Sequence, residues 1–248
     1  MIQKNKIKAL FLLLSFFTTN LLCAKNYMVQ IKPYQSYEIK SQSSGPITYI
    51  KKNSESKYIK EAQVLIEIDA KDEKREYLKQ KASFDIQKEI VKIKEINYKA
   101  KQGIKNLSKY DKNQEKLSFL EAKKILLTNK YEMQMIQREI DKKVFTIKDK
   151  YIDEIFIKEG EYVSVGEKLF EMYDITKLKI TLYLTKNEIK NLEKKEIFIN
   201  DILSDFRLKQ VSKIKDEIKV SRYKVQFIKE NKNLDEYFFD EIVRVEIK

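Results

Sequence analysis

Histidine and tryptophan are absent from this sequence of 248 residues, which also has only one cysteine, four glycines and two prolines. Without histidine the chain lacks the most frequent general base and metal ligand, and it cannot form a Ser–His–Asp or Cys–His arrangement. A single cysteine excludes disulfide bonds within the chain and zinc sites built on several cysteines. Four glycines are too few for a Rossmann loop or a P-loop in addition to ordinary turns. The composition therefore argues against most enzymes, and we expect no catalytic residue, no cofactor and no metal site.

The charge is strongly positive, since 51 Lys and Arg residues against 38 Asp and Glu residues give a formal net charge of +13. Only five of the basic residues are arginine, whose guanidinium group binds phosphates and guanine bases through two hydrogen bonds. The lysines are spread along the chain and form no clustered patch in the sequence, so we expect no nucleic-acid partner. Attraction to anionic lipid headgroups stays open as a secondary property.

The N-terminal residues have the features of an export signal. Lysines at positions 4, 6 and 8 precede the apolar run 9–17, which is too short to span a bilayer comfortably. We predict a signal peptide at 1–24 that is cleaved after Ala24. A lipid-modified Cys23 is an alternative, although leucine stands before it where a lipobox has a small residue, and a retained anchor is another. In each case the protein works outside the cytoplasm.

The segment 72–143 is rich in Lys, Glu, Ile, Leu, Gln and Ala, contains no proline and one glycine, and favours helix throughout. Two runs within it have the alternating spacing of three and four residues that is typical of a coiled-coil seam. The first run is Ile86, Ile90, Ile93, Asn97 and Ala100, and the second is Leu117, Leu120, Lys124, Leu127 and Tyr131. We predict that these residues form the seam between two helices.

A short turn separates the two runs. We expect Gly103 to end the first helix in the left-handed conformation, and Ser108 with Asp111 three residues later is an N-cap signature for the second helix. The arms are then about 31 and 34 residues, or about 50 Å each at a rise of about 1.5 Å per residue. Arms of similar length around a short turn predict an antiparallel hairpin. Two helices of a compact bundle would need further long helices, whereas the rest of the chain has the pattern of strands.

Segments on either side of the hairpin repeat one another at a constant offset of 104 residues. The offset aligns Tyr58 with Tyr162, Ile59 with Val163, Ala62 with Gly166, Leu65 with Leu169 and Glu67 with Glu171. Both copies end in alternating apolar residues, and further strands are expected at 45–50 and 151–157. Such a repeat predicts two similar β-elements related by a pseudo-twofold axis, which would also bring the two ends of the hairpin together.

This order of half-motif, helical hairpin and half-motif resembles the periplasmic adaptor proteins, or membrane fusion proteins, of tripartite efflux and secretion pumps. The segment 155–174, IFIKEGEYVSVGEKLFEMYD, resembles the second half closely, whereas the first half has Ala62 where glycine is usual. The resemblance implies an α+β, multi-module fold. In this fold a long antiparallel α-helical coiled-coil hairpin is inserted in a split biotinyl/lipoyl-like β domain, which is followed by a small antiparallel β-barrel. A swinging-arm role is not implied, because the hairpin replaces the turn that carries the modified lysine in true lipoyl carriers.

The resemblance covers residues 27–248 and divides the chain into modules. These are the signal peptide at 1–24, an N-terminal strand region at 25–44, the two lipoyl-like halves at 45–71 and 144–174, the hairpin at 72–143 and the barrel at 175–248. In the barrel we expect a strand at 178–184, a short helix at 187–193 capped by Thr185, and strands at 197–202, 206–214, 223–228 and 239–247.

The function implied by the resemblance is that of a non-enzymatic adaptor. Its implied partners are an inner-membrane transporter, with the multidrug resistance-nodulation-division (RND) type favoured, and an outer-membrane channel of the TolC type. The resemblance also implies a hexameric ring of this chain, located in the periplasm at the inner-membrane periphery. An adaptor of an ABC-type export or metal efflux system and an envelope structural coiled-coil protein are the alternatives.

The hairpin tip allows a finer comparison with the RND adaptors, which often carry Arg, then Leu four residues later, then Ser seven residues further on. Aligned on Ser108, this chain has Asn97 and Lys101 at the other two positions, so only the serine is kept. The channel-contacting candidates implied by the resemblance are Gln102, Lys105, Leu107, Ser108, Lys109 and Asp111. Ser108 alternatively serves only as a helix cap.

Overall fold

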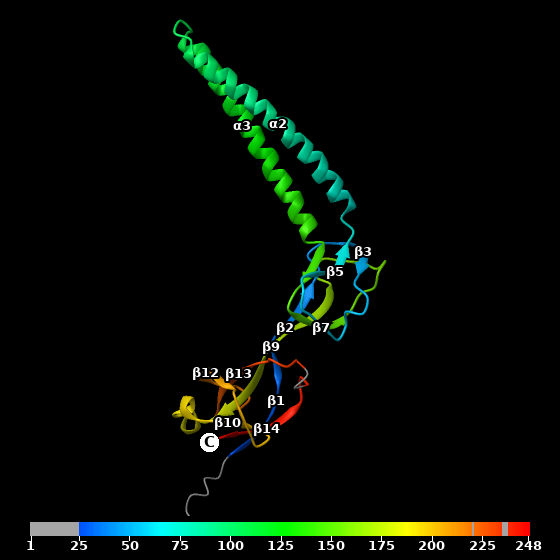
Figure 1. Ribbon diagram of the computed structural model, residues 1–248, viewed down its shortest axis with the longest axis vertical. Helices are drawn as coiled ribbons and strands as arrows, with labels where there is room; N and C mark the ends of the chain where they lie inside the picture. Colours follow the sequence, from blue (N-terminus) through cyan, green and yellow to red (C-terminus); the bar gives the residue numbers. More distant parts are fainter. Residues whose placement is uncertain (1–24, 220, 235–237) are drawn as a thin grey trace, which may run out of the picture. The chain divides into compact units, whose positions relative to one another are not determined.

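A computed structural model describes residues 25–219, 221–234 and 238–248 of the chain (Figure 1). The predicted signal peptide at 1–24 lies outside the described residues. The chain divides into two compact units, Ser36–Tyr173 and the chain up to Gln35 together with Asp174–Lys248. Each unit has its own cluster of buried apolar side chains. No helix within the described ranges is long and apolar enough to cross a membrane.

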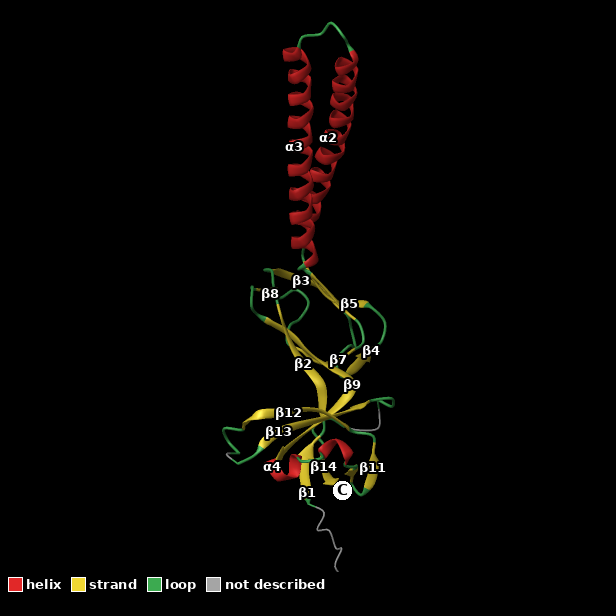
Figure 2. Ribbon diagram, turned by 90° about the vertical axis from the view of Figure 1, so that its left-hand side faces the viewer, coloured by secondary structure: helices red, strands yellow, loops and turns green. Residues whose placement is uncertain are grey.

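Two helices of equal length belong to the Ser36–Tyr173 unit. Helix α2 spans Lys71–Gly103 and helix α3 spans Lys109–Asp141, with 33 residues each. They lie side by side and run in opposite directions, joined by a short turn (Figures 1 and 2). The acidic first turn of α2 and the basic last turn of α3 both complement the helix dipoles. The predicted α+β fold with a long antiparallel helical hairpin is confirmed.

The seam between the helices differs from the predicted one, because all ten predicted seam residues are exposed. The rings of Tyr98 and Phe119 stack between the helices at a centroid distance of 5.8 Å. The buried Gln87 Nε2 donates a hydrogen bond to the Ala122 carbonyl oxygen at 2.8 Å. The residues of α2 that are at least half-buried include Tyr77, Gln80, Phe84, Gln87, Val91 and Tyr98, again spaced by three and four or by a multiple of that repeat. Helix α2 thus carries two such sets, and the less aliphatic set faces α3.

Strands flank the hairpin on both sides. Before it come β2 (Lys32–Lys40), β3 (Gly45–Ile50), β4 (Lys57–Ile59) and β5 (Gln63–Ile68), and after it come β6 (Val144–Ile147), β7 (Lys150–Ile155), β8 (Tyr162–Val163) and β9 (Lys168–Leu184). Strand β3 pairs with β5 on its own side of the hairpin and with β8 from the other side. Strand β7 likewise pairs with β9 on its own side and with β4 from the other. The two copies of the repeat therefore exchange strands reciprocally, and aligned residues such as Leu65 and Leu169 are both fully buried.

The base of the hairpin is joined to these strands by Lys143, which follows Lys142, the C-cap of α3, and is buried. Its Nζ donates hydrogen bonds to the Asp69 carbonyl oxygen at 2.8 Å and to the Glu73 carboxylate. Its own carbonyl oxygen accepts the backbone N–H of Ile68 at 2.8 Å. One residue thus ties the end of α3 to the start of α2 and to β5.

The second unit contains two sets of antiparallel strands. In one, β1 (Asn26–Gln30) pairs with β14 (Ile242–Ile247), β14 with β10 (Ile197–Ile199) and β10 with β11 (Ile202–Ser204). In the other, the second part of β9 pairs with β13 (Tyr223–Glu230), and β13 with β12 (Arg207–Lys215). Helix α4 (Lys186–Ile189) and the 3₁₀-helix η1 (Leu192–Lys194) follow β9. The Thr185 cap predicted for a longer helix is present, with Glu188 accepting the Thr185 backbone N–H at 2.7 Å.

Candidate partner-contacting site at the hairpin tip

The turn at the hairpin tip is short because both helices are capped close to it. Gly103 remains helical as the last residue of α2, and the following residue Ile104 is extended. The predicted left-handed conformation of Gly103 is therefore wrong, since the extended backbone at Ile104 ends the helix. Ser108 is the N-cap of α3, as predicted, and its Oγ accepts the backbone N–H of Asp111 at 3.1 Å.

Contacts between the two helices hold the tip together. Gln102 Nε2 donates to the Lys112 carbonyl oxygen at 3.4 Å, and Lys112 Nζ donates to the Gln102 carbonyl oxygen at 3.3 Å. One position lower on α2, the Lys101 ammonium group forms an ion pair with Glu115 of α3. The Ser108 hydroxyl also donates to the Asp111 carboxylate at 2.6 Å. These contacts order the turn before any partner arrives, which lowers the entropy cost of binding.

The structure brings all six predicted tip residues into one small region. Five of them are exposed, and Leu107 is half-buried. The prediction missed two apolar side chains at the tip, Ile104 in the turn and Tyr110 at the start of α3, which are 49% and 71% exposed. Exposed apolar side chains at the end of a long hairpin are candidates for a protein contact. Their signal in the sequence is an aliphatic and an aromatic residue close to a turn that has no core to fill.

The side chains at the tip are suited to binding a partner. Among the six predicted tip residues the charged groups are Lys105, Lys109 and Asp111, and Asp111 is engaged by the Ser108 cap. Within the part of the chain that the structure describes, no group of three or more His, Cys, Asp or Glu residues is placed to hold a metal ion. The tip can therefore offer a partner two apolar side chains, two ammonium groups and a rigid frame.

Comparisons with known proteins address the fold of the whole chain. Neither a family model nor a curated protein sequence matches it. Among solved structures, the membrane fusion protein Spr0693 from Streptococcus pneumoniae matches with a TM-score of 0.66 at 10% identity, over 91% of this chain and 99% of that one. A chimeric MacA–MexA protein with the α-hairpin domain of Pseudomonas aeruginosa MexA matches with a TM-score of 0.61 at 17% identity, over 91% and 81%. MacA from Actinobacillus actinomycetemcomitans matches with a TM-score of 0.55 at 16% identity, over 91% and 79%.

The chain has the membrane fusion protein fold. The resemblance inferred from the split repeat and the hairpin is thereby confirmed at the level of the fold. The match extends over nine tenths of the chain, so it includes the flanking strands as well as the hairpin.

In this membrane fusion protein fold, the two arms of the hairpin carry exposed apolar residues away from the seam. We call Ile86, Ile90 and Ile93 the α2 stripe, and Leu117, Leu120, Leu127 and Tyr131 the α3 stripe. At 3.6 residues per turn, the α2 stripe lies about 120° around its helix from the seam, and the α3 stripe about 160° around its own. Because the helices run in opposite directions, these offsets place the two stripes on opposite flanks of the hairpin.

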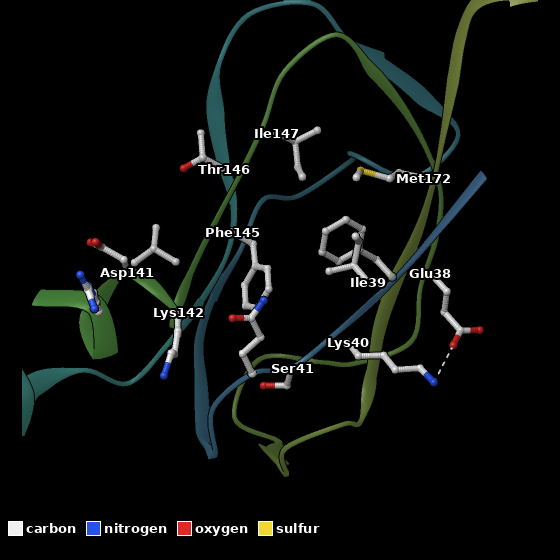
Figure 3. A pocket seen from close by; sticks show the side chains of 14 residues that line it. Glu38, Ile39, Lys40, Ser41, Asp141, Lys142, Phe145, Thr146, Ile147 and Met172 are labelled. Atoms are coloured by element: carbon white, nitrogen blue, oxygen red, sulfur yellow. Dashed lines mark ion pairs between the residues drawn. The ribbon is translucent and has the colours of Figure 1, made fainter. Parts of the chain in front are cut away.

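A groove of about 840 Å³ adjoins the base of the hairpin, between β2, β6 and the end of α3 (Figure 3). Its apolar lining comprises Ile39, Val144, Phe145, Ile147, Phe170 and Met172. Its charged lining has both signs, with Glu38 and Asp141 beside Lys40, Arg138 and Lys142, and Lys40 pairs with Glu38 at 3.0 Å. This mixture suits an amphipathic chain segment better than a phosphate or a metal ion.

Proposed function

We propose that this chain is the periplasmic adaptor subunit of a tripartite efflux pump, linking an inner-membrane transporter to an outer-membrane channel. One arrangement supports the proposal. A hairpin of two 33-residue helices extends from two β-elements that pair strands with each other, and it ends in an exposed tip that is held by hydrogen bonds between the helices. Each arm is about 50 Å long at about 1.5 Å per residue. A rigid arm with a prepared tip is what spanning a gap between two membrane components requires.

We further propose that the two β-elements form the split biotinyl/lipoyl-like domain, at 45–71 and 144–174. The reciprocal pairing of β3 with β8 and of β7 with β4 supports this reading, as do the aligned buried residues Ile59 and Val163. The hairpin occupies the turn in which a lipoyl carrier has its modified lysine. The domain therefore acts as a scaffold, and the protein acts without a cofactor and without catalysis.

Self-association into a ring is part of the proposal, with six copies by analogy with the family. The α2 stripe and the α3 stripe leave apolar surface on opposite flanks of one hairpin, which a solitary hairpin does not need. Contact of the α2 stripe of one copy with the α3 stripe of the next is a heterologous interface, and such interfaces generate closed rings when the rotation closes.

The remaining parts of the proposal follow the family resemblance. The transporter is of the RND multidrug type, the channel is of the TolC type, and the protein lies in the periplasm beside the inner membrane after cleavage behind Ala24. An ABC-type or metal-exporting transporter is the alternative. The exported substrate is chosen by the transporter, so this chain carries no substrate pocket in the proposal.

Crosslinking in cells tests the adaptor role directly. A photoreactive amino acid at Lys109, on the tip, is expected to trap an outer-membrane channel protein identified by mass spectrometry. The matched control carries the same amino acid at Lys79, an exposed position near the base of α2, and should not trap the channel. Capture of only this chain or of cell-wall components from Lys109 would instead favour a structural coiled-coil protein.

Disulfide crosslinking tests the ring. Ile93 and Leu120 lie at nearly the same level of the hairpin, since Gln87 meets Ala122 and Lys101 meets Glu115. The double variant Ile93→Cys/Leu120→Cys should give a ladder of oligomers under oxidation, and either single variant should not. A dimer from Ile93→Cys alone would show a symmetric contact and contradict the ring.

A further inference from the structure

The end of the β12–β13 hairpin presents two isoleucines that nothing in the described structure covers. Ile214, near the end of β12, is 80% exposed, and Ile218, in the loop that follows, is 90% exposed. Both belong to the unit formed by the chain up to Gln35 and Asp174–Lys248. Two aliphatic side chains exposed to this degree at a loop end do not contribute to the core of their own unit.

Cationic side chains surround these isoleucines. Lys213 and Lys215 flank Ile214 in the sequence, and Lys219 follows Ile218. All three are exposed. Two acidic residues lie in the same loop, the exposed Glu217 and Asp216, whose carboxylate accepts the backbone N–H groups of Ile218 at 3.1 Å and Lys219 at 2.8 Å. Asp216 therefore shapes the loop, and the three lysines exceed the two acidic residues by one positive charge.

A basic cleft of about 670 Å³ adjoins the same loop. Four cations line it, namely Lys32, Lys219, Arg222 and Lys224, and none of its lining residues is acidic. Of these four, Lys32 alone forms an ion pair with a described residue, Asp240. The other contacts of the cations leave their charge uncompensated, since Lys219 Nζ lies 4.2 Å from the ring centroid of Tyr183 and Arg222 donates to a backbone carbonyl oxygen. An anionic ligand would relieve this repulsion.

The same positive field acts on a neighbouring lysine. Burial lowers the pKa of Lys179, and the positive charges of Lys209, Lys224 and Lys32 lower it further. The lysines come from β2, β9, β12 and β13, which are distant in the sequence. The spread of the lysines along the sequence did not reveal this group, because folding gathers cations that the sequence keeps apart.

We propose that this end of the β12–β13 hairpin docks on an anionic phospholipid surface. Ile214 and Ile218 enter the interfacial layer, while Lys219, Arg222 and Lys224 bind lipid phosphate groups. An acidic protein surface would match the cations but would leave the two isoleucines unexplained, whereas a bilayer interface offers phosphate and apolar layers together. This inference takes from the proposed function only the location of the protein beside the inner membrane. It does not depend on the presence of a transporter or a channel.

Vesicle binding of the protein that begins at Lys25, the residue after the predicted cleavage site, tests the proposal. Co-sedimentation is measured with vesicles of phosphatidylglycerol and phosphatidylcholine, and with phosphatidylcholine alone. We expect binding to the anionic vesicles that weakens with salt, and at least tenfold weaker binding to the neutral ones. Two variants, Ile214→Ser/Ile218→Ser and Lys215→Glu/Lys219→Glu/Lys224→Glu, should each lose at least tenfold in partitioning. Circular dichroism checks that both remain folded.

The matched control is Lys88→Glu/Lys116→Glu/Lys123→Glu, which changes the net charge equally at exposed positions of the helical hairpin. It should bind anionic vesicles as the unaltered protein does. Equal loss in this control would reduce the effect to net charge and overturn the proposal. Loss with the lysine variant but none with the isoleucine variant would also overturn it, and would favour an acidic protein partner. Either failure would leave the Lys109 crosslinking result, and so the adaptor role, unaffected.

Discussion

Replacing Lys143 by methionine should loosen the base of the hairpin. The ammonium group, whose side chain is 8% exposed, donates to the Asp69 carbonyl oxygen and to the Glu73 carboxylate, and methionine keeps a similar stem but removes both bonds. A buried acceptor left without a donor costs about 1–3 kcal/mol, and cutting one partner of a buried ion pair costs about 3–5 kcal/mol. Because the Glu73 side chain is 32% exposed and can regain water, we expect a loss of about 2 kcal/mol in the free energy of unfolding.

Urea unfolding followed by far-ultraviolet circular dichroism measures this loss, because α2 and α3 dominate the helical signal of the described residues. The control is the adjacent Lys142→Met, which removes a 39% exposed ammonium group paired with Glu139 and should cost less than about 1 kcal/mol. A Lys143→Met protein as stable as the control would refute the reasoning that the buried bonds hold the base together.

Acidification provides a second readout of the same pair. Partial burial raises the pKa of Glu73, but the hydrogen bond and the charge of Lys143 together with a backbone hydrogen bond outweigh this effect and hold the pKa below its usual value. A carboxyl group with a depressed folded-state pKa stabilises the fold above its unfolded pKa and loses this contribution as the pH falls through the folded value. The difference in stability between the unaltered protein and Lys143→Met should therefore shrink below about pH 4.5. A constant difference down to strongly acidic pH would contradict the assignment.

Three further predictions concern other parts of the fold. Gly45→Ala should lower stability by about 1–3 kcal/mol in thermal unfolding, because φ is +150° and a Cβ would lie 2.8 Å from Ile68 Cγ2. The control Gly103→Ala, with no neighbour within 4 Å, should raise stability by up to about 1 kcal/mol, and equal effects at the two glycines would count against the steric argument. Burial raises the pKa of Glu188, but hydrogen bonds from Lys25 and Thr185 outweigh this effect and lower the pKa to about 2. The unaltered protein should therefore lose stability as the pH falls from about 4.5 to that value, and Glu188→Gln should flatten this loss in urea unfolding measured at several pH values. Gln87→Leu should stabilise the hairpin by about 1 kcal/mol through apolar burial, and a loss of that size in urea unfolding would show that the hydrogen bond to α3 matters more than burial.

The helices and the repeat were predictable because their signals are local or repeated. A long segment without proline favours helix at nearly every position, and the Ser108 cap fixes the start of α3 within one residue. The offset of 104 residues aligned strands that the structure pairs reciprocally. Helix propensity and internal repetition can be recognised without knowing which residues are in contact in the folded protein.

The seam was not predictable in the same way, since two registers of α2 satisfy the three-and-four spacing. The expectation that aliphatic residues form a coiled-coil seam favoured the register of Ile86, Ile90 and Ile93, which is the more aliphatic of the two. The observed register instead uses the stacking of Tyr98 on Phe119 and the bond from Gln87 to Ala122. Both depend on which residue of the other helix lies opposite, and that information is absent from a single helical pattern. The basic cleft escaped prediction for a similar reason, because its four cations come from separate segments.

The error at the seam bears on how the protein works. A solitary hairpin would place its most aliphatic faces inside, because burial of each such side chain is worth about 1.5–3 kcal/mol. In α2 the distribution is the opposite, with glutamine in the seam and isoleucine on the flank, whereas α3 has Leu126, Ile136 and Ile140 on its covered side in addition to the leucines on its flank. Polar seam contacts specify the register of the two helices, while the exposed stripes leave apolar surface outside the hairpin. In the ring that we propose, neighbouring hairpins cover these stripes, so the sequence pattern first interpreted as an internal seam serves as the surface on which they meet.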